Sequence, residues 1–209
     1  MQALLDGYRR FRATTWPRLR ETYESLASGQ SPEVLIIACS DSRVDPTRIF
    51  DTQPGELFVI RNVANIVPPF EKRPTGLHGT SAAIEFAVEK LNVRTILVLG
   101  HGRCGGVAAC LDGQETHGVF IDGWIDLLGA ARARLPANCP DVHGALERES
   151  IRVSLERLMG FPFVARAVQE GRLKLEGGLF DIADGRLERF DPATGAFVQV
   201  TDHATSGAN

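Results

Sequence analysis

Three residues that can bind a transition metal follow two apolar stretches of the sequence. Cys39 comes directly after the run at 34–38, and the run at 95–100 leads into His101 and Cys104. Such runs are typical of buried parallel strands, whose carboxyl ends meet at the sheet edge where ligands bind. Two thiolates and one imidazole suit zinc, and three protein ligands leave a fourth position open. The sequence therefore predicts a zinc site at two strand ends.

The local sequence around Cys104 favours a metal site over two structural cysteines and a buried histidine. Cys104 stands where a helix is expected to begin, so the helix dipole helps to keep its sulfur ionised. Two residues separate Cys104 from His101, and this spacing allows both side chains to bind one metal from a single tight turn. Glycine is permissive in its backbone angles, so Gly102, Gly105 and Gly106 are expected to let this turn bend.

Asp41 has alternative roles, and these separate a structural metal site from a catalytic one. As a fourth ligand it would complete the tetrahedron and make the metal inert. Held by Arg43 in a bidentate pair, it would stand beside the metal and leave the fourth position to water. It would then accept a hydrogen bond from that water, whose pKa zinc lowers. An ordinary salt bridge with no catalytic role is the third interpretation.

The rest of the chain predicts helices and further strands around these two strand ends. Helical periodicity or helix-start signals occur at 3–11, 16–26 (with a break near Pro17), 46–50, 78–90, 104–111, 119–134, 142–159 and 161–169. Further strands are expected at 56–61 and 173–182, followed by a hairpin formed by 187–190 and 196–200. This alternation predicts an α/β fold with a mostly parallel central sheet flanked by helices.

Length and composition indicate a single domain over residues 1–209. The chain has 209 residues, of which 44% are hydrophobic, enough for one sizeable core. We expect residues 1–28 to form an N-terminal helical arm and residues 204–209 to be a disordered tail. The apolar residues of the arm need a surface to pack on, either the protein's own sheet or a partner subunit.

Charge and cysteine content limit the possible partners and the compartment. The net charge of −3 gives no reason to expect nucleic acid or an anionic membrane as a partner. No apolar run approaches the roughly 18 residues of a membrane span, and residues 7–12 are polar and basic rather than a signal-peptide core. Four cysteines in a chain of this length do not indicate a disulfide framework. We therefore expect a cytoplasmic protein.

Two motifs resemble the signature motifs of β-class carbonic anhydrases, namely Cys39-Ser40-Asp41-Ser42-Arg43 and Gly100-His101-x-x-Cys104-Gly105-Gly106. The resemblance extends over 54–62, 79–88 and 154–155. It implies one zinc ion per chain on Cys39, His101 and Cys104, with an Asp41–Arg43 dyad beside it. It further implies reversible hydration of carbon dioxide to bicarbonate and a proton, in a homodimer or a higher even-numbered homo-oligomer.

The resemblance also bears on the subtype of the family and on the substrate pocket. Gln30 precedes Cys39 by nine residues, where the open, plant-like subtype has a substrate-binding glutamine; Phe58 and Val63 match its apolar pocket positions. Phe86 stands where that subtype often has tyrosine, and we expect this difference to tune the pocket without abolishing activity. The resemblance favours this subtype over the closed, bicarbonate-regulated one, and implies that a neighbouring subunit supplies part of the pocket.

Two alternative functions remain open from the sequence. A hydrolase of carbon disulfide or carbonyl sulfide would use the same scaffold on another linear molecule with an electrophilic carbon. A non-catalytic bicarbonate- or zinc-binding module would have Asp41 as a permanent fourth ligand. The proton-transfer group is not identified either, because nothing selects one among the histidines at 78, 117, 143 and 203.

Overall fold

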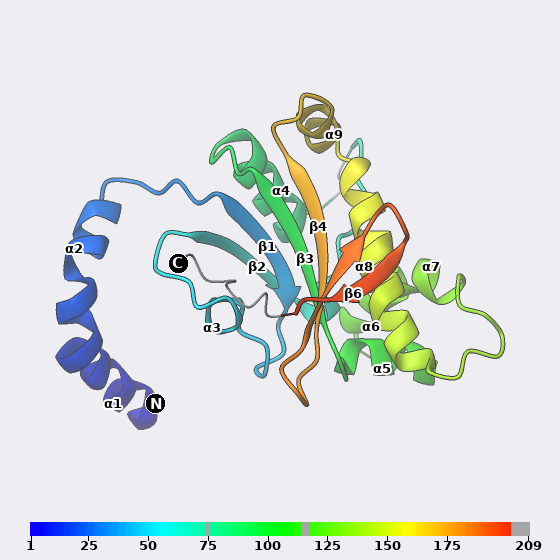
Figure 1. Ribbon diagram of the computed structural model, residues 1–209, viewed down its shortest axis with the longest axis horizontal. Helices are drawn as coiled ribbons and strands as arrows, with labels where there is room; N and C mark the ends of the chain where they lie inside the picture. The colour runs from blue at the N-terminus through cyan, green and yellow to red at the C-terminus, as the bar shows by residue number, and fades with distance from the viewer. Residues whose placement is uncertain (74–75, 114–117, 202–209) are drawn as a thin grey trace, which may run out of the picture.

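A mixed β-sheet organises the computed structural model, which describes residues 1–73, 76–113 and 118–201 (Figure 1). Within these residues the strand order is β2-β1-β3-β4-β5-β6. The strands are β1 (Val34–Cys39), β2 (Leu57–Asn62), β3 (Thr95–His101), β4 (Lys174–Phe180), β5 (Leu187–Asp191) and β6 (Ala196–Gln199). The first four pair in parallel, and β5 and β6 continue the sheet antiparallel. The predicted α/β fold with a mostly parallel sheet is confirmed.

Helices connect the parallel strands and cover the sheet. They are α3 (Pro46–Ile49), α4 (Gly79–Glu89), α5 (Gly105–Asp112), α6 (Ile121–Ile125), α7 (Gly129–Arg132), α8 (Val142–Met159) and α9 (Pro162–Gln169). Short 3₁₀ turns occur at η2 (Val63–Asn65) and η3 (Asp126–Leu128). The single helix expected over 119–134 is wrong, because α6, η3 and α7 divide this stretch. Glycines at 123 and 129 weaken helix propensity there.

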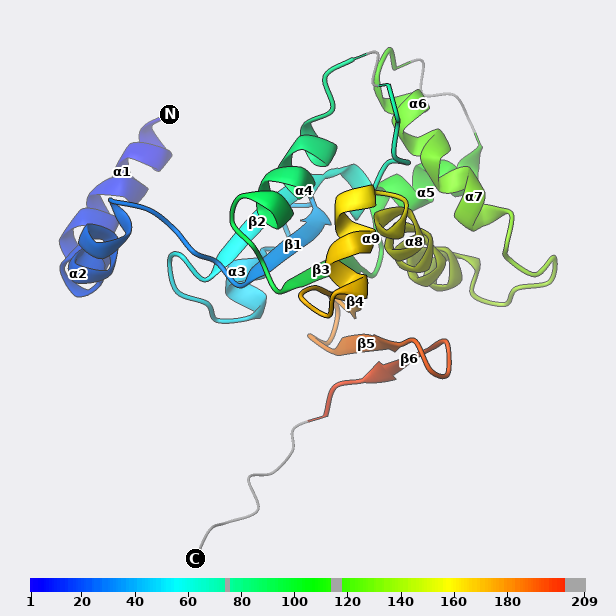
Figure 2. The same cartoon turned by 90° about the horizontal axis from the view of Figure 1, so that it is seen from above.

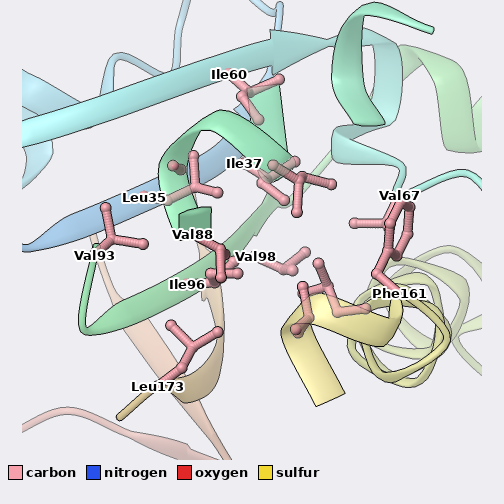
Figure 3. Packing of buried hydrophobic residues seen from close by; sticks show 14 of the residues in the cluster. Leu35, Ile37, Ile60, Val67, Val88, Val93, Ile96, Val98, Phe161 and Leu173 are labelled. Carbon is pink, nitrogen blue, oxygen red and sulfur yellow. The ribbon is translucent and has the colours of Figure 1, made fainter. Parts of the chain in front are cut away.

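The main core lies between the sheet and helices α4, α8 and α9. Figure 3 shows Val88 of α4 and Phe161, just before α9, around residues of the central strands such as Leu35, Ile37 and Val98. Helix α8 packs closely on the sheet, since a Cβ atom at Gly100 or Gly177 would lie 2.8 Å from a methyl group of Ile151. This contact sets the position of α8 relative to the carboxyl end of β3.

An N-terminal helical segment stands away from the sheet (Figures 1 and 2). It consists of α1 (Gln2–Arg10), the π-helical turn η1 (Phe11–Thr15) and α2 (Trp16–Leu26), and none of its residues is buried. The two helices expected on either side of a break near Pro17 are present, and the break takes the form of the π-helical turn, through which the backbone stays helical. Proline lacks the amide hydrogen that would donate to the carbonyl four residues earlier. The π-helical turn before Pro17 has a different hydrogen-bond spacing and accommodates this missing donor. Coverage of this segment by another subunit stays a prediction.

Some expectations from the sequence fall on residues that the structure does not describe. The tail predicted over 204–209 lies outside the described residues, as do His117 and His203. Among the residues that are described, no helix is both long and apolar enough to cross a membrane.

Candidate metal centre

The three predicted metal ligands meet at the carboxyl ends of two neighbouring strands. Strands β1 and β3 are adjacent and parallel, so Cys39 at the end of β1 reaches the same edge as His101 at the end of β3. Cys104 is the third residue after the end of β3 and is the N-cap of α5. The ligand atoms of the three side chains all lie within 4.8 Å of one another, and all three residues are buried.

The hydrogen bonding of His101 fits a role as a metal ligand. Its Nδ1 atom lies 2.9 Å from the carbonyl oxygen of Gly102, which can accept a hydrogen bond from Nδ1 only when Nδ1 is protonated. This tautomer leaves the Nε2 lone pair free. Nε2 is buried without a hydrogen-bond partner in the described part of the chain. A bound metal would satisfy this otherwise costly buried nitrogen.

The two thiols are arranged so that a cation between them is favourable. A hydrogen bond from Cys104 lowers the pKa of Cys39 well below its usual value, and the main-chain amide of Ala64 also donates to the Cys39 sulfur at 3.3 Å. The same contact raises the pKa of Cys104 well above its usual value, because a second negative charge would lie beside the first. A divalent cation removes this repulsion and allows both sulfurs to ionise. The donor set therefore fits zinc.

Asp41 forms the bidentate pair with Arg43 that the sequence allowed. The guanidinium donates from Nε to Oδ1 at 2.9 Å and from Nη2 to Oδ2 at 2.7 Å. This pairing holds the pKa of the Asp41 carboxyl well below its usual range. Its Oδ2 atom lies 3.9 Å from Nε2 of His101, so the carboxylate stands next to the ligand cluster. Asp41 is thus an acceptor-only group beside the site of the metal.

Arg61 fixes the loop that contains Asp41 by hydrogen bonds, a role that the sequence did not indicate. Its guanidinium donates to the carbonyl oxygens of Cys39 at 2.9 Å, Asp41 at 2.6 Å and Val44 at 2.8 Å. In the sheet Arg61 pairs with Ala38, one residue before the first ligand. Only this pairing, which the sequence did not reveal, would have pointed to it.

The loop after β2 turns an amide group toward the first ligand. The side chain of Asn62 closes the loop by accepting from the Ile66 amide at 2.8 Å and donating to the Ile66 carbonyl at 2.9 Å. Between them Ala64 has a left-handed backbone with φ of 61°. This conformation directs the Ala64 amide to the sulfur of Cys39. Trp124 of α6 holds the same loop by donating to the Val63 carbonyl at 2.8 Å.

The turn between β3 and α5 bends at a residue that the sequence did not suggest. Arg103 has a left-handed backbone with φ of 59°, whereas Gly102, Gly105 and Gly106 do not have positive φ. The expectation that these glycines supply the bend is therefore wrong. Gly106 instead allows close approach, since a Cβ atom there would lie 2.9 Å from the Cβ of Ala64.

A buried carboxylate from a distant helix contacts this turn. Glu147 of α8 is 5% exposed and accepts a hydrogen bond from the main-chain amide of Cys104 at 3.0 Å. Burial raises the pKa of the Glu147 carboxyl, although the hydrogen bond from Cys104 opposes this effect. The sequence analysis did not consider Glu147, because its position within a helix carries no signal of this contact.

The predicted substrate-binding residues are divided between two places within one chain. Val63 follows β2 at the carboxyl edge of the sheet, next to Ala64. Phe58 and Phe86 contact each other, with ring centroids 5.9 Å apart, but Phe58 pairs with Leu35 near the beginning of β1. Gln30 is exposed and precedes β1. A strand of six residues spans about 20 Å, so one chain does not bring Gln30 or Phe58 to its own metal ligands.

Comparison with known proteins identifies the family. A family model described as carbonic anhydrase matches residues 34–187. A carbonic anhydrase of Pseudomonas aeruginosa is 40% identical over 215 residues, which cover 97% of this chain and 93% of that protein. The chloroplastic β carbonic anhydrase 5 of Arabidopsis thaliana is 42% identical over 178 residues, or 81% of this chain and 58% of the plant protein. This chain belongs to the β-class carbonic anhydrases.

Solved structures agree with this assignment. The β-carbonic anhydrase CcaA matches with a TM-score of 0.87 and 32% identity, over 96% of this chain and 99% of that one. A tetrameric β-carbonic anhydrase of Sordaria macrospora matches with a TM-score of 0.80 and 32% identity, over 90% and 95% of the two chains. The family and the Cys-His-Cys cluster together identify the chain as an enzyme, carbonate dehydratase, that hydrates carbon dioxide.

Proposed function

We propose that this carbonic anhydrase works with an open zinc site, in which Cys39, His101 and Cys104 hold one zinc ion per chain and Asp41 stays off the metal. The observation that carries this proposal is the bidentate Asp41–Arg43 pair. Both carboxylate oxygens already accept charge-assisted hydrogen bonds from one guanidinium, and rotating Asp41 onto the metal would disrupt this bidentate geometry. When bound, zinc supplies a water whose lowered pKa makes it a nucleophile near neutral pH.

Asp41 and Arg43 act together on that nucleophile. The carboxylate can only accept hydrogen bonds, so the water donates its hydrogen to Asp41. This orientation directs the oxygen lone pair of the water toward the carbon of the substrate. Arg43 keeps Asp41 ionised and fixes the plane of its carboxylate. Arg43 also donates to the carbonyl of Arg103 at 3.1 Å, which ties the dyad to the turn that carries Cys104.

The pocket is completed by a second subunit, so that the minimal unit is a homodimer. Val63 supplies an apolar wall from the same chain as the zinc ligands, whereas Phe58, Phe86 and Gln30 come from the neighbour. Two observations support this arrangement: the unburied N-terminal helices offer apolar residues to a partner, and the related Sordaria macrospora enzymes are tetrameric. Apolar walls with one amide donor suit a small nonpolar substrate that becomes an anion.

The pH dependence of turnover tests the open site. Because Arg43 lowers the pKa of Asp41 far below neutrality, Asp41 remains a carboxylate throughout the assay range. Stopped-flow hydration from about pH 6.5 to 9, with zinc quantified on the same sample, should show turnover that persists near neutrality and declines only as the pH falls below the pKa of the nucleophilic water. Turnover that appears only above roughly pH 8 would instead indicate an Asp41 ligand displaced by alkali.

A mixed dimer tests the assignment of Gln30 to the neighbouring site. Gln30→Ala should lower kcat/KM about tenfold, the effect of one lost hydrogen bond, and Asp41→Asn should lower it further. If Gln30 acts across the interface, a dimer of one Gln30→Ala subunit and one Asp41→Asn subunit contains one intact site. We expect roughly half of the wild-type activity per dimer.

The mixed dimer is prepared by co-expressing the two variants with different affinity tags and purifying on both. Wild-type subunits carrying the same two tags are the control for the procedure. If Gln30 acts within its own chain, both sites of the mixed dimer carry a defect. Activity near a few per cent of the control, rather than about half, would then contradict the proposed pocket.

We further place the enzyme in a reducing compartment such as the cytoplasm. The thiols of Cys39, Cys104, Cys110 and Cys139 are all free, and the metal site needs two of them as thiolates. Fractionation of the producing cells with an activity assay of each fraction tests this placement.

A further inference from the structure

Two side chains form hydrogen bonds with opposite sides of the peptide group that joins Arg103 to Cys104. Its carbonyl oxygen accepts from Nη2 of Arg43 at 3.1 Å, and its amide donates to Oε1 of Glu147 at 3.0 Å. Because a peptide group is planar, fixing its carbonyl and its amide fixes the orientation of the whole unit. Glu147 is separated from Cys104 by 43 residues and reaches the turn from α8.

This peptide controls where the sulfur of Cys104 points. Arg103 has a left-handed backbone, which a residue with a side chain rarely adopts and which its surroundings must hold in place. Cys104 then returns to an extended conformation, with φ of −70° and ψ of 124°, before α5 begins. A rotation of the Arg103–Cys104 peptide would change the direction of the Cys104 Cα–Cβ bond, and with it the distance to Cys39 and His101.

The burial of Glu147 is not accounted for by an ion pair. Its carboxylate is 5% exposed, and in the described part of the chain no Arg or Lys forms a salt bridge with it. Burying a carboxyl group without a cation is costly, so its contact with the metal-site turn is the interaction that explains its presence. Its neighbour two residues on, Glu149, instead pairs with Arg134 and Arg152.

We propose that Glu147 is a positioning residue of the zinc site. Together with Arg43 it fixes the orientation of the Arg103–Cys104 peptide, so that the Cys104 sulfur points toward the metal. The role is carried by the acceptor oxygen of the side chain. It goes beyond the proposed function, and rests on it only in that zinc occupies the cluster of Cys39, His101 and Cys104.

The cleft beside Glu147 makes the role testable without loss of the fold. A cleft of about 530 Å³ is lined by Arg103, Cys104, His143 and Glu147. If the Glu147 side chain is shortened, water from this cleft can satisfy the Cys104 amide. Water does not fix the peptide as a buried carboxylate does, so the turn becomes mobile while the core of the sheet stays packed.

The test compares Glu147→Ala, Glu147→Gln and the control Glu149→Ala. Metal-free protein of each variant is titrated with zinc in competition with a chromophoric chelator, and the absorption of the cobalt-loaded form reports thiolate coordination. We expect Glu147→Ala to weaken zinc binding about 10- to 100-fold and to change the cobalt–thiolate absorption. Glu147→Gln, which keeps an acceptor oxygen, should stay within about threefold of wild type.

The control separates positioning from general destabilisation. Glu149→Ala removes two ion pairs from the same helix but no contact with the turn, so it should leave zinc affinity unchanged. Wild-type zinc affinity in Glu147→Ala, a loss in Glu147→Gln as large as in Glu147→Ala, or an equal loss in Glu149→Ala would each overturn the proposal. Absence of zinc binding by the wild-type protein would overturn the proposed zinc site itself, which distinguishes the two failures.

Discussion

Replacing Asp41 by Asn is expected to lower the turnover of carbon dioxide hydration at least about 100-fold while zinc stays bound. Asparagine has nearly the same shape, but its amide nitrogen is a donor and cannot accept from Arg43 or from the nucleophilic water. The two bonds between oppositely charged groups that now hold the carboxylate would be reduced to one bond from the guanidinium to a neutral amide oxygen. Stopped-flow hydration and metal analysis of the same preparation measure both quantities.

Asp45→Asn is a suitable control for this substitution. Asp45 lies four residues further along the same loop and caps α3, where its side chain accepts from the Thr47 amide at 3.0 Å. Asparagine caps helices about as well as aspartate, so we expect turnover and zinc content close to wild type. If Asp41→Asn also had wild-type turnover, Asp41 would have no part in orienting the nucleophile.

The second large effect is expected from Cys39→Ser, which should abolish turnover because the protein no longer retains zinc. Serine preserves the size of the side chain and can still accept the hydrogen bond from the Ala64 amide. A neutral hydroxyl is a much poorer ligand for zinc than a thiolate, so zinc affinity should fall more than about 100-fold. Equilibrium dialysis against a chelator, followed by metal analysis, measures this loss.

Cys110→Ser provides the matched control, since Cys110 is buried on α5 but is not part of the ligand cluster. A hydroxyl in this apolar surrounding should cost about 1 kcal/mol of stability and leave zinc content unchanged. Retention of zinc and turnover by Cys39→Ser would show that Cys39 is not a ligand. Loss of zinc from Cys110→Ser as well would show that the assay reports unfolding.

Sequence patterns were sufficient to predict that the metal ligands lie close together. Two apolar runs of strand length, each followed by a potential ligand, predict neighbouring parallel strands whose ends share one edge, and β1 and β3 have this arrangement. The Asp41–Arg43 pair was also predictable, because both residues belong to one short loop after β1. Two residues that are close in the sequence stay close in the folded protein, since the backbone between them has few allowed conformations.

Contacts between distant segments could not be predicted in this way. The left-handed backbone at Arg103, the hold of Arg61 on the Asp41 loop and the contact of Glu147 with Cys104 depend on strand register and on how closely α8 approaches the sheet. A charged residue in a strand or helix has the same appearance in the sequence whether its side chain faces water or a buried amide.

The sequence by itself thus determined the fold class and the identity of the ligand cluster, because strand periodicity and residue type are local properties of the chain. Only the tertiary structure decided what supports the cluster and how far other residues lie from it. Gln30 precedes β1 and Cys39 ends it, so a strand of six residues, which spans about 20 Å, lies between them, and no motif indicates this. The physical reason is that packing and strand geometry join or separate residues independently of their distance along the chain.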